Sequence, residues 1–530
     1  MSQKRESKVE VFRVNIKKTI LIHPFLFTLI SIQFLYQGAS VTISFTQVFR
    51  ALFLLWMLLV LLSFPAYKIL KDWDWVGISL SLFAFGFFYE QHIFIVVVSI
   101  LAIILLLLFF YIKIRKRKTR IEEITLFLNV LSFVFVLVVG INFISLLGNI
   151  PNSYYQNILL RSADEVIAQA SPYSEKPDIY YIVLDAYSNS EILTELYGYD
   201  NSSFLSHLHE KGFIIPSTAR SNYPKTALSV PATLNMNYVQ RIAPELEESY
   251  FWWLMTPLIS NSQTRIMLED IGYQSVAIAS DWSITNNRTT DYYYSPSSLQ
   301  VSDFENYILQ NTALIVIKPL LEKIAFVPSN ASHRSLILYN FESLSHIPDL
   351  QGPHFVFSHI ISPHPPFVFD KNGNMADPGY SLTFSDANDY PGSQEEYRQG
   401  YIEQVDFINK QTMRIIDEIL EKSTTPPIII LQADHGSGML TDFNSLENTC
   451  LKERFSPFSA YYLPNLDKDL IPEDITPVNI FRIVFNEYFE TDLPLLENRF
   501  YFPKDAVHIY DMDEISLQDI NNTPCDISLE

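Results

Sequence analysis

Long apolar stretches separated by short polar ones dominate the first 150 residues. Five can be delimited, at Thr19–Tyr36, Ala51–Tyr67, Trp75–Tyr89, Ile93–Ile112 and Ile124–Leu147. A helix needs about 20 apolar residues to cross roughly 30 Å of hydrocarbon, and the last two stretches have that length. Five such stretches in succession predict an N-terminal transmembrane domain of five helices over residues 1–150.

Beyond residue 150 the pattern changes. Short apolar runs alternate with segments in which apolar residues recur at the spacing of a helix. The runs predict buried strands at Ile179–Asp185, Phe213–Pro216, Ser275–Ser280, His354–Ile361 and Ile428–Gln432. Helices are predicted near 201–211, 264–271 and 397–422, and the polar stretch 280–310 is interpreted as an excursion over the surface. Strands that alternate with helices indicate an α/β fold with helices on both faces of one sheet. We expect a linker at 151–177, a folded domain at 178–490 and a C-terminal tail at 491–530.

The distribution of charge orients the chain. Residues 1–150 carry 15 Lys and Arg against 7 Asp and Glu, and the basic residues gather before the first stretch, after the second and after the fourth. With five crossings these three segments lie on one side, which the positive-inside rule makes cytoplasmic. The domain after residue 150 is then extracytoplasmic, on an integral membrane protein. Charged residues are nearly absent within the stretches, which argues against a channel or transporter.

The remaining 380 residues are strongly acidic, with 22 Lys and Arg against 51 Asp and Glu. Nucleic acid is therefore not an expected partner, because phosphate backbones require clustered basic residues. Cys450 and Cys525 are the two cysteines of the chain. They can form one disulfide but neither a disulfide scaffold nor a cysteine zinc site.

Three of the predicted strands run into side chains that bind metal ions. Asp185 ends the first strand, His364 follows the strand at 354–361, and Asp434 and His435 follow the strand at 428–432. Carboxylate oxygen and imidazole nitrogen bind divalent cations, and the carboxyl ends of parallel strands meet at one edge of a sheet. Each residue alone has an ordinary alternative, since a strand-terminal Asp is often a helix cap and a histidine between prolines can simply be packed. Their convergence favours a site.

A fourth segment, residues 221–232, offers a nucleophile. Thr226 stands at the start of a predicted short helix, where metal coordination and the helix dipole can activate its hydroxyl. Lys225 beside it can hold an anionic substrate. The alternative is that Thr226 or Ser229 is only a helix N-cap.

Taken together, these segments resemble the alkaline phosphatase superfamily, nearest its sulfatase-like branch with lipoteichoic acid synthases and lipid A phosphoethanolamine transferases. The matching pieces are DIYYIVLDAYS at 178–188, TALSVP at 226–231, SPHPPF at 362–367 and ADHG at 433–436, in the family's order. The transferases also have five membrane helices before an outward catalytic domain. The resemblance implies an α/β/α sandwich of the alkaline phosphatase/sulfatase type, with the catalytic domain at 178–490.

By the same resemblance, one divalent metal ion (Zn, Mn, Mg or Ca) is bound by Asp185, Thr226, Asp434 and His435. Thr226 would be the nucleophile, and His364 would protonate the leaving group. The chain departs from the family in having Asp185 where the transferases usually have Glu. It also lacks their second histidine in the stretch 452–458, where Arg454 either grips a substrate oxyanion or forms a surface ion pair.

The expected function is that of a membrane-anchored, metal-dependent transferase. It would move a phospho-linked group from a membrane lipid to an envelope glycan or lipid through a covalent ester on Thr226. Neither cysteine lies near residue 226, so formylglycine sulfatase chemistry is not expected. Two alternatives stay open: a hydrolase of phosphate or sulfate esters, with water as acceptor, and an inactive domain that serves as an envelope scaffold.

Overall fold

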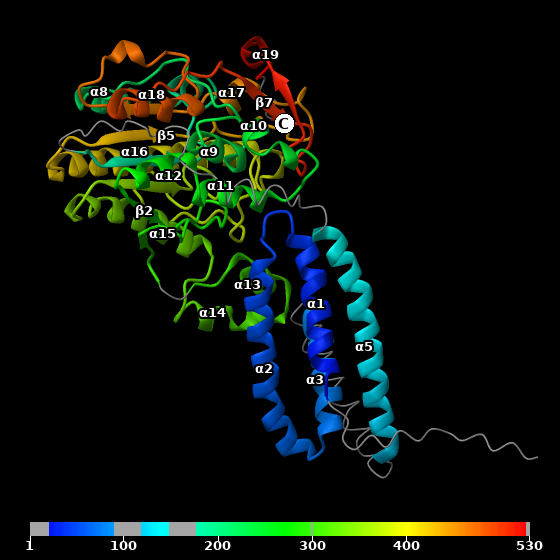
Figure 1. The fold of residues 1–530 in the computed structure, drawn as a ribbon. Coiled ribbons are helices and arrows are strands. Elements are labelled where there is room, and N and C mark those ends of the chain that lie inside the picture. Colours follow the sequence, from blue (N-terminus) through cyan, green and yellow to red (C-terminus); the bar gives the residue numbers. More distant parts are fainter. Residues whose placement is uncertain (1–20, 90–117, 148–175, 298–299, 526–530) are drawn as a thin grey trace, which may run out of the picture. The chain divides into compact units, whose positions relative to one another are not determined.

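The computed structural model describes residues 21–89, 118–147, 176–297 and 300–525, and its internal contacts divide the chain into two units (Figure 1). The first unit holds the described residues within 1–38, 45–147 and 307–317, and the second holds those within 39–44, 148–306 and 318–530. The predicted linker at 151–177 lies almost wholly outside the described residues.

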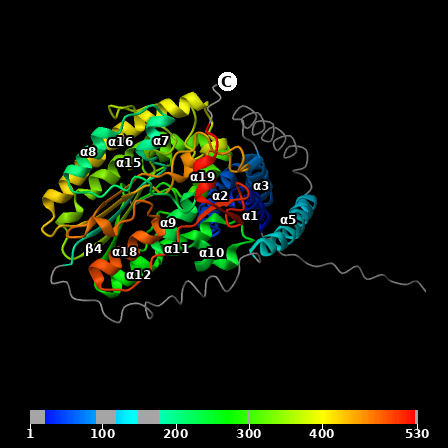
Figure 2. The ribbon, with the colours of Figure 1, turned by 90° about the horizontal axis from the view of Figure 1, so that it is seen from above.

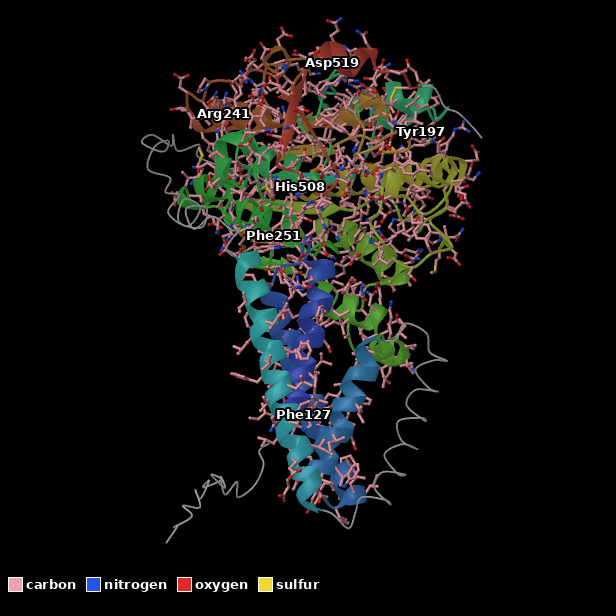
Figure 3. The ribbon with its side chains drawn as sticks, turned by 90° about the vertical axis from the view of Figure 1, so that its right-hand side faces the viewer. Phe127, Tyr197, Arg241, Phe251, His508 and Asp519 are labelled. Carbon is pink, nitrogen blue, oxygen red and sulfur yellow. A yellow bond between two sulfur atoms is a disulfide. The ribbon has the colours of Figure 1, made fainter. Side chains whose placement is uncertain are left out.

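The described part of the first unit consists mainly of four helices, α1 (His23–Ala39), α2 (Thr46–Leu70), α3 (Trp73–Tyr89) and α5 (Lys118–Leu147). Polar contacts of His23, the first residue of α1, join it to α3 and α5. Nδ1 of His23 forms a hydrogen bond with the Ser81 hydroxyl on α3 at 2.6 Å, and the His23 amide donates to Asn129 Oδ1 on α5 at 2.9 Å. Large apolar side chains point outward instead of inward. Phe127 on α5, for example, is 63% exposed (Figure 3), which suits contact with lipid.

Two of the helices are long and apolar enough to cross a bilayer, α2 over its whole length and α5 over Ile121–Val138. Helices α1 and α3 have 17 residues each, at the lower limit for a span. The stretch Ile93–Ile112 lies outside the described residues. Five spans therefore stay a prediction, and the structure supports the coarser statement of an apolar helical N-terminal region with two candidate spans.

The second unit is built on a six-stranded sheet in the order β3-β2-β4-β1-β5-β6. Its strands are β1 (Ile179–Leu184), β2 (Gln274–Ile278), β3 (Tyr292–Tyr294), β4 (His354–Ile360), β5 (Ile428–Gln432) and β6 (Ser459–Tyr462). All neighbours pair in parallel except β5 and β6. Every residue of β1, β4 and β5 is buried, because helices cover both faces of a parallel sheet.

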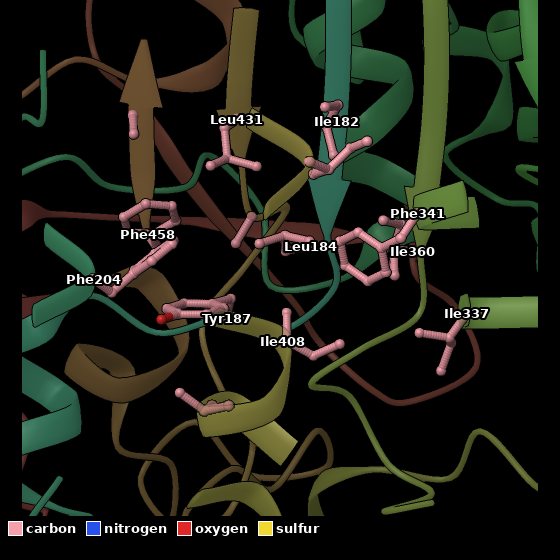
Figure 4. Packing of buried hydrophobic residues seen from close by; sticks show 14 of the residues in the cluster. Ile182, Leu184, Tyr187, Phe204, Ile337, Phe341, Ile360, Ile408, Leu431 and Phe458 are labelled. Atoms are coloured by element: carbon pink, nitrogen blue, oxygen red, sulfur yellow. The ribbon is translucent and has the colours of Figure 1, made fainter. Parts of the chain in front are cut away.

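Alternate side chains of β1 enter opposite layers. Ile182 and Leu184 pack in one apolar cluster with Phe341 of α15 (Asn330–Leu344) and Ile408 of α16 (Gln394–Lys422), as Figure 4 shows. Tyr181 points the other way and contacts Phe481 of α18 (Pro477–Phe489) edge to face, with ring centroids 5.4 Å apart. Figure 2 shows the two helical layers on either side of the strands. The expected α/β class with helices on both faces is confirmed.

Short helices complete the second unit: α7 (Ser190–Glu195), α8 (Ser202–Glu210), α9 (Thr226–Leu234), α10 (Val239–Ile242), α11 (Thr256–Ser260), α12 (Gln263–Asp270), α14 (Lys318–Leu321) and α17 (Leu451–Phe455). Helix α13 (Asp303–Asn311) begins in this unit. Two sequence expectations were wrong. Residues 213–216 form no strand, because Ile214 makes only an isolated bridge to Tyr461. The stretch 280–310 contains β3 and α13, although it is polar, because β3 is an edge strand and needs little apolar surface.

Residues after 490 form the hairpin β7 (Phe500–Pro503) and β8 (Met512–Ile515), followed by α19 (Leu517–Asn522). Phe500, Phe502 and Ile520 pack in one apolar cluster with Leu451 and Phe455 of α17. A disulfide joins Cys450, at the start of α17, to Cys525. The one disulfide that the composition allows is therefore formed.

Candidate active site

Loops at the carboxyl ends of three adjacent parallel strands form the core of the site. Asp185 follows β1, His364 lies in the loop after β4, and Asp434 and His435 follow β5. Backbone groups tie these loops together: the Ala186 amide donates to Asp434 Oδ1 at 3.2 Å, and the His364 amide donates to the Asp185 carbonyl at 3.1 Å. The strand order thus brings together residues that are up to 250 positions apart in the chain.

Helix α9 delivers Thr226 to the same place. Thr226 is its first residue, and the Thr226 hydroxyl lies 3.1 Å from Nε2 of His435. One turn later, the Ser229 hydroxyl donates to the Asp434 carbonyl at 2.7 Å and so fixes α9 against the loop after β5. Neither hydroxyl caps the helix, since Lys225 occupies the N-cap position and no side chain makes a cap hydrogen bond there. The helix-cap alternative for Thr226 and Ser229 is therefore wrong.

These residues open onto a cavity of about 430 Å³. Its walls include all but one of the candidate site residues predicted from the sequence: Asp185, Lys225, Thr226, His364, His435 and Arg454. Asp434 lies directly behind them, fully buried. The structure thus brings all seven predicted residues together around one space.

Lys225 is held between aromatic rings. Its ammonium lies 3.3 Å from the centroid of the Phe443 ring and 4.8 Å from that of Trp252, where ring quadrupoles attract a cation. Burial, together with repulsion by Arg454, lowers the pKa of Lys225 to about 7. Lys225 therefore stands next to Thr226 in the wall of the cavity, where it can contact an anionic group.

Arg454 lies in the interior and does not form the surface ion pair that its neighbour Glu453 suggested. It is 2% exposed and donates to Asp386 Oδ2 at 2.6 Å, to the Pro224 carbonyl at 2.7 Å and, through Nη2, to His435 Nε2 at 3.2 Å. Burial alone would raise the pKa of Asp386. The Arg454 guanidinium and, to a smaller extent, His364 outweigh burial and hold this pKa well below its ordinary value. Asp386 also lies 3.8 Å from His364 Nε2 and thereby links two of the predicted site residues.

We expect Asp386→Asn to destabilise the fold by about 3–5 kcal/mol, because it leaves a buried guanidinium without its counter-charge. The folded-state pKa of Asp386 is depressed, so its contribution is present above the unfolded pKa of about 3.9 and is lost as the pH falls below that value. Chemical unfolding at pH 7 and near pH 3 measures both effects.

Asp417→Asn is the matched control, because Asp417 pairs with Lys211 at 2.7 Å at the surface and is 42% exposed. Its loss should cost less than about 1 kcal/mol. Equal losses from the two substitutions at pH 7 would contradict the role given to the buried pair.

The arrangement of lone pairs around Asp185, Asp434 and His435 fits a divalent cation. Nδ1 of His435 donates to the Gly436 carbonyl at 2.9 Å, so Nε2 presents a lone pair. That lone pair accepts from Arg454 Nη2 at 3.2 Å. It also lies 3.2 Å from Asp434 Oδ2 and 3.6 Å from Asp185 Oδ1, two buried oxygens that receive no hydrogen bond from any described residue. Burial and the nearby Arg454 lower the pKa of His435 to about 3, which keeps the imidazole neutral. Acceptors gathered in this way suit a divalent cation, which would take the place of Arg454 as the partner of Nε2.

Two polar residues of the site were missed by the sequence reasoning. His359, in β4, is fully buried, and its Nε2 lies 3.2 Å from Asp185 Oδ2. Ligand atoms of Asp185, His359 and Asp434 all lie within 4.8 Å of one another. Asp386 comes from an irregular loop. The pattern of apolar positions in the sequence does not distinguish either residue. For His359, its position near the end of a predicted strand was the feature that could have identified it.

Several solved structures resemble the chain, each at low sequence identity. No protein of curated function matches the chain in sequence. Among solved structures, the zinc complex of the C-terminal periplasmic domain of EptC from Escherichia coli has a TM-score of 0.42 at 10% identity, over 64% of this chain and 93% of that one. The same domain of phosphoethanolamine transferase EptC from Campylobacter jejuni gives 0.37 at 12% identity, over 61% and 92%. Lipoteichoic acid synthase LtaP from Listeria monocytogenes gives 0.38 at 12%, over 62% and 78%.

At such low sequence identity, the roles of residues in these proteins cannot be assigned to residues of this chain. The family model is more informative, because residues 177–479 match the model of the sulfatases, and this match covers more than half of the chain and contains every candidate site residue. The chain therefore belongs to the sulfatase family, within the alkaline phosphatase superfamily.

Proposed function

We propose that the protein is a membrane-anchored, metal-dependent transferase that moves a phospho-linked group from a lipid donor to an envelope glycan or lipid through an ester on Thr226. The observation that carries the proposal is the position of the Thr226 hydroxyl. It stands at the start of α9, 3.1 Å from His435, and opens onto a cavity that Lys225 and Arg454 also line. A hydroxyl that shares a cavity with an amine and a guanidinium is suited to attack phosphorus.

The residues around Thr226 suit two successive displacements. A metal ion held by Asp185, Asp434, His435 and Thr226 would lower the pKa of the Thr226 hydroxyl and offset negative charge on the phosphoryl oxygens. Thr226 Oγ1 forms the new bond to phosphorus and loses its proton to water in the cavity, while the bond from phosphorus to the lipid oxygen breaks. His364 Nε2 gives that oxygen a proton. The acceptor hydroxyl then attacks phosphorus and passes its proton to His364, while the bond from phosphorus to Thr226 Oγ1 breaks and this oxygen takes a proton back from water in the cavity.

Asp386 supports His364 in this scheme. Nδ1 of His364 donates to the Pro365 carbonyl at 2.6 Å, so Nε2 is the nitrogen that faces the cavity. Asp386 Oδ2 lies 3.8 Å from this nitrogen and places a carboxylate beside the proposed proton donor. The same carboxylate holds Arg454, so one group fixes both the proton donor and a cation that faces the substrate.

Two further features support a lipid donor and an extracytoplasmic site. The helices of the first unit carry exposed apolar side chains and two candidate spans, which would keep the protein at the bilayer. The Cys450–Cys525 disulfide is typical of an oxidising compartment outside the cytoplasm. Both cysteines are joined in this bond, so neither is a precursor of formylglycine at the nucleophile position.

The experiment is to map the peptide that contains Thr226 by mass spectrometry, on protein isolated from its own membrane. We expect a phosphodiester adduct on Thr226, whose mass identifies the transferred group. Incubation with a labelled phospholipid should place the label on the same peptide. A sulfate adduct would overturn the proposal in favour of a sulfate ester hydrolase, and release of the labelled group to water alone would make the protein a phosphodiesterase.

A further inference from the structure

His359 is a buried histidine with no part in the mechanism above. It is the sixth of the seven residues of β4, 1% exposed, and it lies between two polar partners. Its Nε2 is 3.2 Å from Asp185 Oδ2, and its Nδ1 is 2.8 Å from the Thr285 hydroxyl. Its Nε2 thus faces the same buried group of acceptors as the lone pair of His435.

Thr285 is the partner of Nδ1 of His359, and its hydroxyl also lies 3.1 Å from the Ser280 hydroxyl. Its hydroxyl has a single hydrogen, and the Trp282 carbonyl 3.3 Å away can only accept it. When Thr285 donates to that carbonyl, its oxygen accepts from Nδ1–H of His359, and Nε2 is left with a lone pair directed at Asp185. A metal ligand commonly has its ring oriented in this way by a second residue behind it.

The remaining contacts favour a ligand over a simple hydrogen-bond donor. Asp185 Oδ1 and Asp434 Oδ2 are buried without a hydrogen bond from any described residue, and Nε2 of His359 is close enough to share one ion with both carboxylates. If His359 only donated to Asp185, this hydrogen bond would reach Oδ2 and leave Oδ1 unsatisfied.

We propose that His359 binds the metal ion directly through Nε2, in the tautomer that Thr285 holds. This inference rests on the metal centre of the proposed function and specifies it further. The group of ligand atoms that all lie within 4.8 Å of one another then supplies one imidazole and two carboxylates, from His359, Asp185 and Asp434. Imidazole nitrogen suits zinc and cobalt, whereas magnesium and calcium prefer oxygen ligands. The site therefore selects a zinc-type ion.

The test uses the full chain in detergent, freed of metal with a chelator and titrated with Zn²⁺, Co²⁺, Mg²⁺ or Ca²⁺. We expect Zn²⁺ and Co²⁺ to raise the unfolding temperature at concentrations where Mg²⁺ and Ca²⁺ do not. The visible absorption of bound Co²⁺ reports its ligands. In His359→Gln this band should change in shape, and the affinity should fall by about 100-fold or more. Thr285→Val should weaken binding by about 10-fold, as expected for loss of the residue behind a ligand.

His354→Gln is the matched control, because His354 lies in the same strand, is fully buried and pairs with Asp178 at 3.1 Å. Any general cost of losing a buried histidine of β4 appears in both variants, whereas the Co²⁺ band and the affinity should change only in His359→Gln. An unchanged band in His359→Gln would overturn the inference and make His359 a hydrogen-bond donor to Asp185. That outcome leaves the Thr226 adduct untouched, whereas failure of the proposed function would appear as an absent adduct with metal still bound.

Discussion

Thr226→Ala should reduce turnover by roughly 10⁴-fold or more, because it removes the oxygen on which the proposed covalent ester forms. The Thr226 side chain is mostly buried, yet it makes few packing contacts of its own, since it opens onto the cavity. The fold should therefore persist. The measurement is transfer from a labelled phospholipid by purified variant and wild-type protein, together with the unfolding temperature of each.

Thr233→Ala is the control for this result. Thr233 belongs to the same helix and is fully buried, and its hydroxyl donates only to the Ser229 carbonyl at 2.9 Å. The same side-chain deletion there should cost about 1 kcal/mol of stability and leave turnover nearly unchanged. If Thr226→Ala retained substantial activity, the double-displacement scheme would be wrong, and water activated in the cavity would become the better nucleophile.

Asp434→Asn should have opposite effects on stability with and without metal. In metal-free protein, Asp434 Oδ2 is a buried carboxylate oxygen without a donor and lies close to Asp185. Neutralising it removes repulsion between like charges and should stabilise the metal-free fold by about 1–3 kcal/mol. A metal at 1,000 times its dissociation constant stabilises wild-type protein by about 4 kcal/mol. The variant should gain far less, so wild-type protein becomes the more stable of the two.

Unfolding temperatures measured with chelator and with Zn²⁺ test this reversal. Asp386→Asn provides the contrast, because Asp386 already has Arg454 as its partner at 2.6 Å. The same chemical change there should destabilise the protein in both conditions. A loss of stability in metal-free Asp434→Asn would contradict the prediction and would mean that this carboxylate is stabilised by the protein alone.

The central strands could be predicted because burial on both faces makes them nearly continuous apolar runs. β5 was predicted residue for residue, and β1, β2 and β4 to within two residues at either end. Edge elements were harder to recognise. β3 is three partly exposed tyrosines in a polar stretch, and the run at 213–216 is apolar because it packs beside β6 and not because it pairs along its length. The spacing of apolar residues indicates which positions are buried. At the edge of a sheet a strand can pair without being buried, and a buried segment need not pair.

The site was predictable where chemistry coincides with a strand end. Asp185, Asp434 and His435 each follow a recognisable strand, and parallel order alone brings such ends together. Asp386 had no such signal, because its partner Arg454 lies 68 positions away and only the folded loop joins them. His359 was hidden inside an apolar run, where a histidine looks like any other buried residue until the neighbouring strand places Asp185 beside it.

The disulfide between Cys450 and Cys525 also bears on when the protein becomes competent during its biogenesis. Cys450 begins the short helix that carries Arg454, and its partner lies 75 positions further along the chain. Closing a loop of this length lowers the entropy of the unfolded chain enough to contribute about 4 kcal/mol. With the domain outside the cytoplasm, as proposed, the bond forms only after Cys525 has reached the oxidising side of the membrane. The helix that carries Arg454 is therefore fixed by its disulfide only once export is complete. A partly translocated chain could form the sheet before the wall of the cavity that contains Arg454 is fixed.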